Sequence, residues 1–337
     1  MKKISVVVPC RNESMFIKEC IEAIYHCSLP EQIQLSVFVV DGMSEDGTRD
    51  KVLQLIKIFP SLHLVDNQMQ LTPFAFNIGI AQQEFDYLQI VGARHVLSPN
   101  YLSLAWSKLN ADADTWCVGG KINNKFLTKT GEIISKAMAT RFGMGIGNFR
   151  TLDKSGFTDT VTSPMYRADV FDKIGYFDEE LTRNQDDDFN FRISNAGGKI
   201  YYCNEISLSY YVRASFSGLW RQFFQYGYWK VYVNKKHRAI TTWRQMVPPI
   251  FVLYIGLMLL PITVLPEYTW LVILPLLTYV LFASVTALKV AKFNVFFIVL
   301  KSFIYLHISY GLGYLVGIIH FLLLNKKPSK KQKRMSR

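Results

Sequence analysis

The pattern of hydrophobic and polar positions predicts alternating strands and helices over the first quarter of the chain. Short apolar runs have the length of buried strands, and between them apolar residues recur every three or four positions, as in amphipathic helices. We expect strands at residues 4–9, 35–40, 62–66 and 87–91, and helices at residues 14–25, 48–59 and 72–82. This alternation is typical of a parallel sheet with helices on both faces.

The pattern continues less regularly as far as residue 212. We expect helices at residues 99–109, 132–142 and 169–174, strands at 115–121 and 158–167, and two closing strands at 198–202 and 207–212. Residues 143–150 carry three glycines, which disfavour a helix interior and favour a mobile loop, here expected over an acceptor site. Arg150 at its end either contacts a phosphate or is a solvated surface arginine.

An aromatic and basic helix is expected to begin near residue 217. Trp and Tyr favour the lipid headgroup layer, and arginine and lysine favour anionic lipid. The segment combines both kinds of residue, among them Arg221, Trp229 and Lys230, and Arg221 and Trp229 are also candidate acceptor or supporting residues of the site. We therefore expect residues 217–243 to form an amphipathic helix at a membrane surface, which can also pack on the preceding domain.

Long apolar segments follow this helix. Residues 247–266 and 269–288 each have the length of a membrane span, and the short link between them predicts a hairpin. Residues 293–324 are apolar but too long for one simple span, and they contain Lys301, His307 and several glycines. We expect this segment to be re-entrant, split or partly interfacial, because a single crossing would place the basic tail outside the cell.

Composition and charge favour a membrane protein over a nucleic-acid-binding one. The formal net charge is +12, and half of the residues are hydrophobic, most densely in the last third of the chain. Much of the basic excess lies beside apolar segments and in the tail, as the positive-inside rule expects. The five cysteines form no CxxC pair, so we expect no zinc ribbon or disulfide framework, and a reducing cytosol. The N-terminus leads directly into a strand, so no cleavable signal peptide is expected.

Residues 39–48, with the sequence VVDGMSEDGT, carry the first candidate chemistry. Asp41 stands where the expected strand ends and a turn begins, and ligands bind at the carboxyl edge of an open α/β sheet. Gly42 and Gly47 allow backbone conformations that other residues resist. Asp41 either accepts hydrogen bonds from a base or ribose or forms an Asx turn that caps the next helix, and the local pattern leaves both open.

The end of the first strand, VVVPCRNE, adds a second motif one strand–helix unit earlier. Together the two motifs resemble the opening of the inverting family 2 glycosyltransferases. The resemblance implies an α/β domain of the GT-A fold with a mostly parallel sheet, in which Pro9, Arg11, Glu13 and Asp41 line the pocket of a nucleotide-sugar. Residues 77–79 are similar to an N-x-G that the family often carries.

The most informative departure from the family lies at residues 89–99, in the place of its DxD motif. That motif supplies a carboxylate to a divalent cation that bridges the diphosphate of the sugar nucleotide. Here Gly92, Ala93 and Arg94 are followed by His95, and none is a carboxylate. Hard cations prefer oxygen ligands, so a divalent metal (Mg²⁺ or Mn²⁺) is disfavoured, and a lone His95 is a poor substitute. Either Arg94 neutralises the diphosphate as a bidentate donor, or the loop has diverged and other residues hold the metal.

The catalytic candidate is Asp186, the first of three adjacent aspartates before an expected helix. Adjacent carboxylates repel one another unless cations or a helix N-terminus compensates. In the family, E-D-x-D-L-x-x-R holds the base that takes the proton from the acceptor hydroxyl. Aligned on Arg192, Asp186 falls on the base and Asp188 on the second acidic position, Asp187 is a supporting carboxylate, and Gln185 replaces the usual Glu. We expect Arg192 to pair with Asp188; on its own, the run would indicate only an acidic helix start.

The resemblance extends over residues 1–236. There NQDDDFNFRISNAGGKIYY and RQFFQYGYWK are similar to the succinoglycan glucosyltransferase (ExoA-like) subgroup. It implies an inverting glycosyltransferase that moves a hexose from a nucleotide-sugar, expected to be UDP-linked, to a polyprenyl-diphosphate-linked saccharide in exopolysaccharide or capsule synthesis. The alternatives are a polyprenyl-phosphate glycosyltransferase and a non-catalytic scaffold of an assembly complex.

These expectations define a domain plan and a location. A GT-A catalytic domain is expected at residues 1–216, an interfacial helix at 217–243, a transmembrane region at 244–325 and a basic cytoplasmic tail at 326–337. The protein would be a multi-pass protein of the plasma membrane with its catalytic domain in the cytoplasm. Its expected partners are the nucleotide-sugar donor, the lipid-linked saccharide acceptor, membrane lipid and other polysaccharide-assembly enzymes, with no nucleic acid.

Overall fold

The computed structural model describes residues 1–145, 152–212, 215–258, 266–290 and 293–328. The chain divides into two compact units, which are described separately. The first comprises Met1–Lys125 and Gly147–Tyr211, and the second Phe126–Ile146 and Val212–Arg337.

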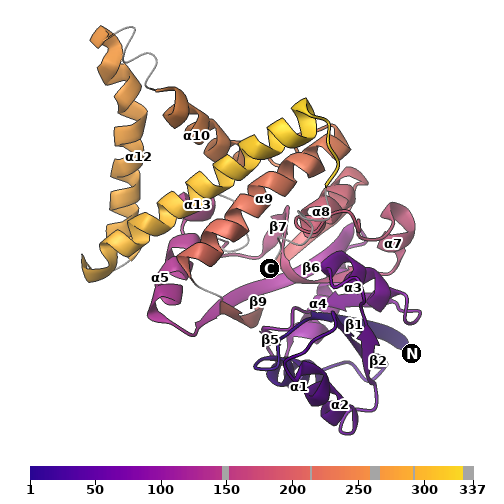
Figure 1. The fold of residues 1–337 in the computed structure, drawn as a ribbon. Helices are drawn as coiled ribbons and strands as arrows, with labels where there is room; N and C mark the ends of the chain where they lie inside the picture. The colour runs from indigo at the N-terminus through magenta and orange to yellow at the C-terminus, as the bar shows by residue number, and fades with distance from the viewer. Residues whose placement is uncertain (146–151, 213–214, 259–265, 291–292, 329–337) are drawn as a thin grey trace. The chain divides into compact units, whose positions relative to one another are not determined.

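The first unit is an α/β fold whose elements follow the predicted order (Figure 1). Its strands are β1 (Lys2–Cys10), β2 (Ile33–Asp41), β3 (Leu62–Asp66), β4 (Tyr87–Ile90), β5 (His95–Leu97), β6 (Thr115–Phe126), β7 (Gly156–Thr158), β8 (Thr162–Arg167) and β9 (Lys199–Val212). Its helices are α1 (Ile17–Tyr25), α2 (Thr48–Ile56), α3 (Thr72–Ile80), α4 (Tyr101–Ala111), α7 (Asp169–Ile174) and α8 (Gln185–Asn195).

Within the described residues these strands form one sheet in the order β3-β2-β1-β4-β8-β6-β9-β5, with β7 paired to β9. The pairs β1–β2, β1–β4 and β2–β3 are parallel, as the sequence predicted. The later strands β8, β5 and β7 add antiparallel pairs. The chain leaves β3 at the edge and returns to the other side of β1 as β4, so β1 and β4 flank a topological switch point, where ligands bind in such sheets.

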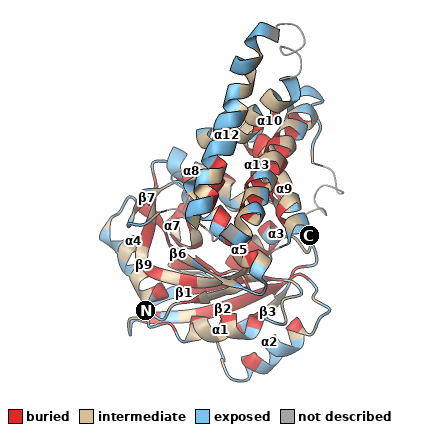
Figure 2. Cartoon of the chain, turned by 90° about the vertical axis from the view of Figure 1, so that its left-hand side faces the viewer, coloured by how far each residue is buried: buried red, intermediate tan, exposed pale blue. Residues whose placement is uncertain are grey.

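Two hydrophobic cores cover the two faces of this sheet. Alternate residues of β1 point to opposite faces, so Ile4, Val6 and Val8 join one core and Val7 joins the other. Helices α1, α2 and α4 pack on the first core, and α3, α7 and α8 pack on the second. Figure 2 shows α1 and α2 together on one side of the strands. The predicted helices on both faces are therefore confirmed.

The sequence predicted two closing strands, at 198–202 and 207–212. This prediction is wrong in one respect, because the structure has a single strand there, β9. Its first half pairs with β7, where Tyr202 is opposite Gly156. Its second half pairs with β5, where Leu208 is opposite Leu97. Partners along both halves keep the backbone extended through the polar residues between them.

The second unit consists of helices. They are α5 (Lys129–Met138), α6 (Arg141–Met144), α9 (Phe216–His237), α10 (Val247–Leu257), α12 (Thr269–Val290) and α13 (Phe296–Gly317), with α13 continuing as a π-helix over Ile318–Leu323. Short 3₁₀ turns cover Trp243–Met246, Pro266–Tyr268 and Phe293–Val295. Of the expected span at 247–266, α10 covers the first part, and residues 259–265 lie outside the described residues.

Helices α9 and α13 lie side by side in close contact (Figure 1). A Cβ on Gly227 of α9 would come 2.0 Å from the carbonyl oxygen of Tyr310, and one on Gly313 of α13 would come 2.0 Å from that of Phe224. Such contacts leave no room for a side chain, so only glycine permits this approach of the two backbones. The glycines expected to interrupt 293–324 are thus packing residues. The expected split or re-entrant arrangement is wrong, because the structure has one continuous helix there.

The same packing corrects the expected role of Trp229 at a membrane surface. Trp229 is 1% exposed and Lys230 is 0% exposed. Trp229 packs against Tyr232 and Phe321, the latter in the C-terminal continuation of α13. Helix α9 does carry the aromatic and basic residues noted in the sequence. However, helix α13 covers the face of α9 on which Trp229 lies.

Two helices within the described residues are long and apolar enough to cross a membrane, α12 and the helix over Phe296–Leu323. Only 11% of the apolar window of α12 is buried, against 44% for the second helix. Figure 2 shows exposed positions along most of α12. Its exposed side chains include Leu271, Leu274, Leu277, Leu281 and Phe282. A helix with this much exposed apolar surface requires apolar surroundings, which is consistent with membrane association.

Candidate active site

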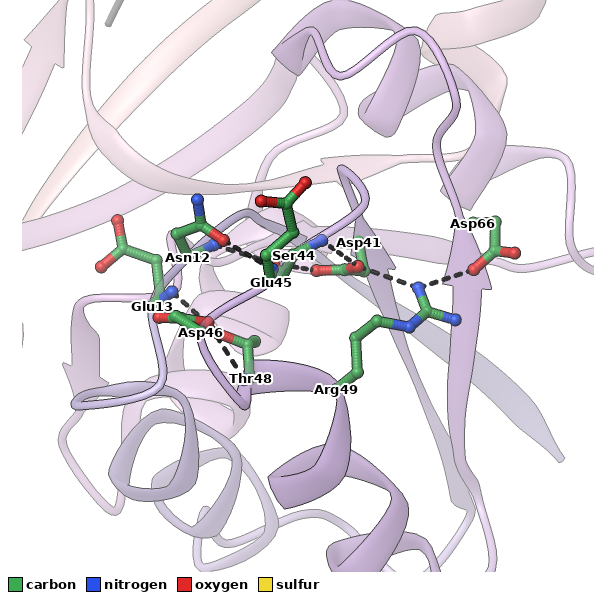
Figure 3. Close-up of polar contacts among 9 residues, drawn as sticks. All are labelled: Asn12, Glu13, Asp41, Ser44, Glu45, Asp46, Thr48, Arg49 and Asp66. Carbon is green, nitrogen blue, oxygen red and sulfur yellow. Dashed lines mark hydrogen bonds and ion pairs between the residues drawn. The ribbon is translucent and has the colours of Figure 1, made fainter.

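Hydrogen bonds join the loop after β1 to the loop after β2 (Figure 3). The backbone N–H of Asn12 donates to Ser44 Oγ at 2.8 Å, and the N–H of Glu45 donates to Asn12 Oδ1 at 2.9 Å. Asn12 adopts a left-handed backbone conformation, with φ 53°, which asparagine tolerates better than most residues. The two motifs recognised in the sequence therefore form one structural frame.

Asp46 and Thr48 extend this frame. The N–H of Glu13 donates to Thr48 Oγ1 at 2.9 Å, and the N–H of Ser14 donates to Asp46 Oδ2 at 3.0 Å. Partial burial by itself raises the pKa of Asp46, but hydrogen bonds from Thr48 and Ser14 outweigh it and lower the pKa to about 2. Sequence reasoning did not single out these supporting residues, although all of them lie within the recognised motifs or beside them.

Asp41 is fully buried at the carboxyl end of β2. Its carboxylate accepts hydrogen bonds from the backbone N–H and the hydroxyl of Ser44, the former at 2.9 Å. It also accepts one from Arg49 Nη1 at 2.9 Å, and the same nitrogen lies 2.8 Å from Asp66 Oδ1. Hydrogen bonds to Asp41 and Asp66 raise the pKa of Arg49. The turn that the sequence offered as one alternative for Asp41 is thus present, and contact with a base or ribose stays a prediction.

Arg11 lies beside this turn. Its Cδ is 3.2 Å from the point where a Cβ on Gly42 would stand, and the backbone of Gln70 is 3.4 Å from the same point. Among the described residues, Arg11 Nε and Asn67 Oδ1 are buried side-chain atoms without a hydrogen-bond partner. The backbone N–H of Asn67 donates to the carbonyl oxygen of Asp41 at 2.8 Å, and this hydrogen bond holds Asn67 in position. Unsatisfied polar atoms of this kind are suited to a polar ligand.

Arg94 and Glu13, both predicted to bind the nucleotide, form an ion pair. Arg94 Nε donates to Glu13 Oε2 at 2.7 Å, and the two side chains are only 16% and 11% exposed. The guanidinium also lies over the ring of Phe16, 4.5 Å from its centroid. Phe16 in turn packs against Tyr211, with ring centroids 4.9 Å apart and the rings tilted by 34°. Arg94 therefore stands at the end of β4 against the loop that follows β1, which is the switch point of the sheet.

The three aspartates occupy the first turn of α8, as predicted. Asp186 is exposed, Asp187 is intermediate and Asp188 is 0% exposed. Asn184 precedes them in a left-handed conformation with φ 61°. A helix N-terminus stabilises negative charge through its unpaired N–H groups. This placement suits a carboxylate that must stay ionised while facing solvent or substrate.

The predicted pair between Asp188 and Arg192 is confirmed. Arg192 Nη2 lies 2.9 Å from Asp188 Oδ2, and Nε donates to the same oxygen at 3.0 Å. Arg192 also donates to the carbonyl oxygens of Ile174 and Tyr176. The arginine thus neutralises the buried aspartate and ties α8 to the loop after α7.

A sequence model described as "Glycosyltransferase like family 2" matches residues 2–242. The chain belongs to this family. The succinoglycan biosynthesis protein ExoA of Rhizobium meliloti (strain 1021) is 28% identical over 72% of this chain and 73% of its own length. A dolichyl N-acetyl-alpha-D-glucosaminyl phosphate 3-beta-D-2,3-diacetamido-2,3-dideoxy-beta-D-glucuronosyltransferase of Methanococcus voltae is 26% identical over 67% of this chain and 72% of its own length. This chain is a glycosyltransferase.

A solved structure supports the fold of this glycosyltransferase. The mannosyltransferase PcManGT from Pyrobaculum calidifontis, in complex with GDP-Man and Mn²⁺, aligns with a TM-score of 0.60. The alignment covers 93% of this chain and 86% of that one, at 18% identity. The GT-A class that the sequence predicted is thereby confirmed.

The structure of the fold neighbour contains Mn²⁺. No cluster of three or more His, Cys, Asp or Glu residues suited to a metal is present in the described part of the chain. At the DxD position, Gly92 has no side chain and Arg94 is a cation. His95 Nδ1 is engaged by Ser163 Oγ at 2.6 Å and by the N–H of Gly92 at 3.3 Å. This donor set does not fit Mg²⁺ or Mn²⁺.

Several predicted site residues lie elsewhere in this glycosyltransferase. Pro9 lies in β1, next to the loop that carries Arg11. Arg221 is exposed on α9, and Trp229 is buried on the same helix, both in the second unit. Arg150 lies outside the described residues. The roles assigned to individual residues in binding and catalysis stay predictions.

Proposed function

We propose that this glycosyltransferase moves a hexose from a nucleotide-sugar to a polyprenyl-diphosphate-linked saccharide at the cytoplasmic face of the plasma membrane. The product would be a repeat unit of an exopolysaccharide or capsule. The observation that carries the proposal is the exposed apolar helix α12, which lies in the same chain as the family 2 domain. A membrane-associated enzyme meets lipid-linked acceptors at the headgroup layer, where their sugars are found.

The names of two relatives support a role in the synthesis of polysaccharides or lipid-linked saccharides. One is named for succinoglycan biosynthesis, and the name of the other contains a dolichyl-linked sugar phosphate as the acceptor. Both are similar to this chain over more than two thirds of their own lengths. The donor nucleotide is proposed to be UDP, bound by the frame around Arg11 and Asp41. Other polysaccharide-assembly enzymes are proposed as partners.

The proposed reaction is a single inverting displacement. The acceptor hydroxyl oxygen attacks the anomeric carbon and forms the new glycosidic bond. The bond from that carbon to the phosphate oxygen breaks, and the nucleoside diphosphate leaves with the electron pair. Asp186 takes the hydroxyl proton as the general base. Asp186 lies in the first turn of α8, where the helix N-terminus favours a negative charge.

The test measures transfer of radiolabelled sugar into the lipid fraction. Membranes that carry the wild-type chain or Asp186→Asn are supplied with a panel of nucleotide-sugars and lipid-linked acceptors. We expect transfer by the wild type, and a loss of about 100-fold or more in Asp186→Asn, because general-base catalysis contributes factors of that order. Asp172→Asn is the matched control, since Asp172 is an exposed carboxylate in the first turn of neighbouring α7.

Each outcome bears on a different part of the proposal. Full transfer by Asp186→Asn to a hydroxyl acceptor would contradict the assigned base. Transfer to a bare polyprenyl phosphate, retained in that variant, would favour the phosphate acceptor instead, because such an acceptor has no hydroxyl proton to remove. No transfer from any donor, in membranes whose protein binds nucleotide, would contradict the proposed enzyme activity.

A further inference from the structure

The side chain of Arg94 is held in place by two contacts that leave part of its guanidinium available. Glu13 binds Nε, and the ring of Phe16 covers one face of the guanidinium. The hydrogen bond to Glu13 comes from Nε, and the Arg94 side chain remains 16% exposed. An arginine fixed in this way presents a planar pair of N–H donors with a permanent positive charge.

The position of this donor pair agrees with where a diphosphate would bind. Arg94 follows β4 and Glu13 follows β1, the two strands that flank the switch point of the sheet. Ligands of open α/β sheets bind in the crevice at the carboxyl ends of such strands. The charge and geometry of a fixed guanidinium match two phosphate oxygens in a bidentate arrangement.

At Gly92, two residues before Arg94, a carboxylate side chain could be accommodated only if the His95 ring moved. A Cβ on Gly92 would lie 3.1 Å from His95 Cε1 and 3.2 Å from Nε2, so the imidazole ring fills the space above this glycine. The ring is fixed there by Ser163 and by an edge-on contact with Tyr210, whose ring centroid is 5.2 Å away. Gly92 and Arg94, which stand at the two acidic positions of the D-x-D pattern, therefore provide no ligand for a metal ion.

We infer that the Arg94 guanidinium takes the place of the divalent cation, so that this enzyme binds the diphosphate of its donor without a metal. Glu13 is then a positioning residue that aims Arg94, and it makes no direct contact with the nucleotide. The inference rests on the proposed function, because it concerns the donor of that same reaction. It changes the role predicted for Glu13 from ligand to support.

The test measures binding of UDP and of GDP to the purified full-length chain in detergent by titration calorimetry, once with excess EDTA and once with Mn²⁺. We expect the dissociation constant of the preferred nucleotide to agree within about twofold between the two conditions. Arg94→Lys keeps the positive charge but loses the planar pair of N–H donors. We therefore expect nucleotide binding to be about 10-fold weaker, without rescue by Mn²⁺. Arg167→Lys is the matched control, because Arg167 pairs with Asp169 away from these loops.

Glu13 variants separate positioning from general structural damage. The amide oxygen introduced by Glu13→Gln still accepts a hydrogen bond from Arg94 Nε, so binding should stay within about threefold of the wild type. Glu13→Ala removes the acceptor and should weaken binding about 10-fold, while the melting temperature stays close to that of Glu13→Gln. Equal affinities in Glu13→Ala and wild type would overturn the positioning role.

The remaining outcomes distinguish the two proposals. Binding that requires Mn²⁺ and disappears in EDTA would overturn the metal-free inference and leave the proposed function standing. Unchanged affinity in Arg94→Lys would overturn the bidentate contact of the guanidinium, because a point charge would then suffice. Absence of UDP and GDP binding in both conditions, together with no transfer from any nucleotide-sugar, would overturn the proposed function itself.

Discussion

The side-chain amide of Asn77 binds the backbone of Phe177 in both directions. Asn77 Nδ2 donates to the Phe177 carbonyl at 2.9 Å, and the Phe177 N–H donates to Asn77 Oδ1 at 3.1 Å. Nδ2 also donates to Glu179 Oε1 at 3.0 Å. The amide on α3 thereby fixes the loop between α7 and α8, and Arg192 holds the same loop from its other side. Asn77 and Arg192 together form a polar clamp on the loop that leads into α8.

The first prediction concerns this clamp. Asn77→Ala removes all three hydrogen bonds, so we expect the free energy of unfolding to fall by about 1–3 kcal/mol. Asn77→Asp keeps an acceptor for the Phe177 N–H but places a second carboxylate beside Glu179. Its melting temperature should therefore rise towards that of the wild type as the pH falls towards about 4, where carboxylates become protonated.

The measurement is thermal unfolding of the detergent-solubilised chain at pH 7 and pH 4. Asn77→Ala serves as the reference, because it removes the same amide without adding a titrating group. Gln82→Ala, an exposed substitution just beyond α3, controls for truncation of a polar side chain. If Asn77→Asp has the same deficit at both pH values, repulsion with Glu179 is not the cause of its instability.

The second prediction concerns the buried pair of Asp188 and Arg192. Arg192→Met removes the cation that pairs with the buried carboxylate of Asp188, and breaking a buried pair in this way costs about 3–5 kcal/mol. The double variant Asp188→Asn/Arg192→Met removes that charge and should recover part of the loss. Denaturant unfolding of the three proteins measures the difference. A double variant no more stable than Arg192→Met alone would contradict charge burial as the cause.

The sequence was sufficient to predict the parallel part of the sheet because its signals are local. Strand β3 and helix α7 have the predicted bounds, and β1 and β2 extend one or two residues beyond them at either end. The pair of Asp188 and Arg192 was also predictable, since residues four apart on a helix face each other. Each of these inferences needed only the spacing of residues along one element.

Contacts between distant segments could not be predicted in this way. The ion pair of Glu13 with Arg94 joins residues 81 positions apart, and no local pattern encodes it. The burial of Trp229 depends on helix α13, which lies far along the chain. A helix pattern shows which face is apolar, but whether lipid or another helix covers that face is decided by tertiary packing.

The third prediction concerns acid stability. Hydrogen bonds hold the pKa of Asp46 at about 2, below the ordinary value of 3.8. A group whose pKa is lower in the folded state stabilises it above its unfolded pKa and loses that effect as the pH falls through the folded pKa. Asp46→Asn should therefore have a lower melting temperature than the wild type above pH 4, and the difference should shrink between about pH 4 and pH 2.

The measurement is thermal unfolding of wild type and Asp46→Asn across this pH range. The difference between their melting temperatures cancels the contribution of the other titrating groups. Asp50→Asn is the control, because Asp50 is exposed in the first turn of α2. A gap between Asp46→Asn and wild type that stays constant from pH 6 to pH 2 would show that the carboxylate charge contributes nothing to the joined loops.

The fourth prediction distinguishes two tryptophans of the segment 217–243, which the sequence predicted to lie at a membrane surface. Trp229 is 1% exposed, whereas Trp243 is 73% exposed. Trp229→Ala should destabilise the chain by about 3–5 kcal/mol, the range for a large buried aromatic residue, and Trp243→Ala should leave its stability nearly unchanged. Trp243 should also react with N-bromosuccinimide in the folded chain, while Trp229 should stay protected until unfolding, as read by mass spectrometry of peptides. Rapid oxidation of Trp229 in the folded protein, or equal stability of the two variants, would show that helix α13 does not cover α9.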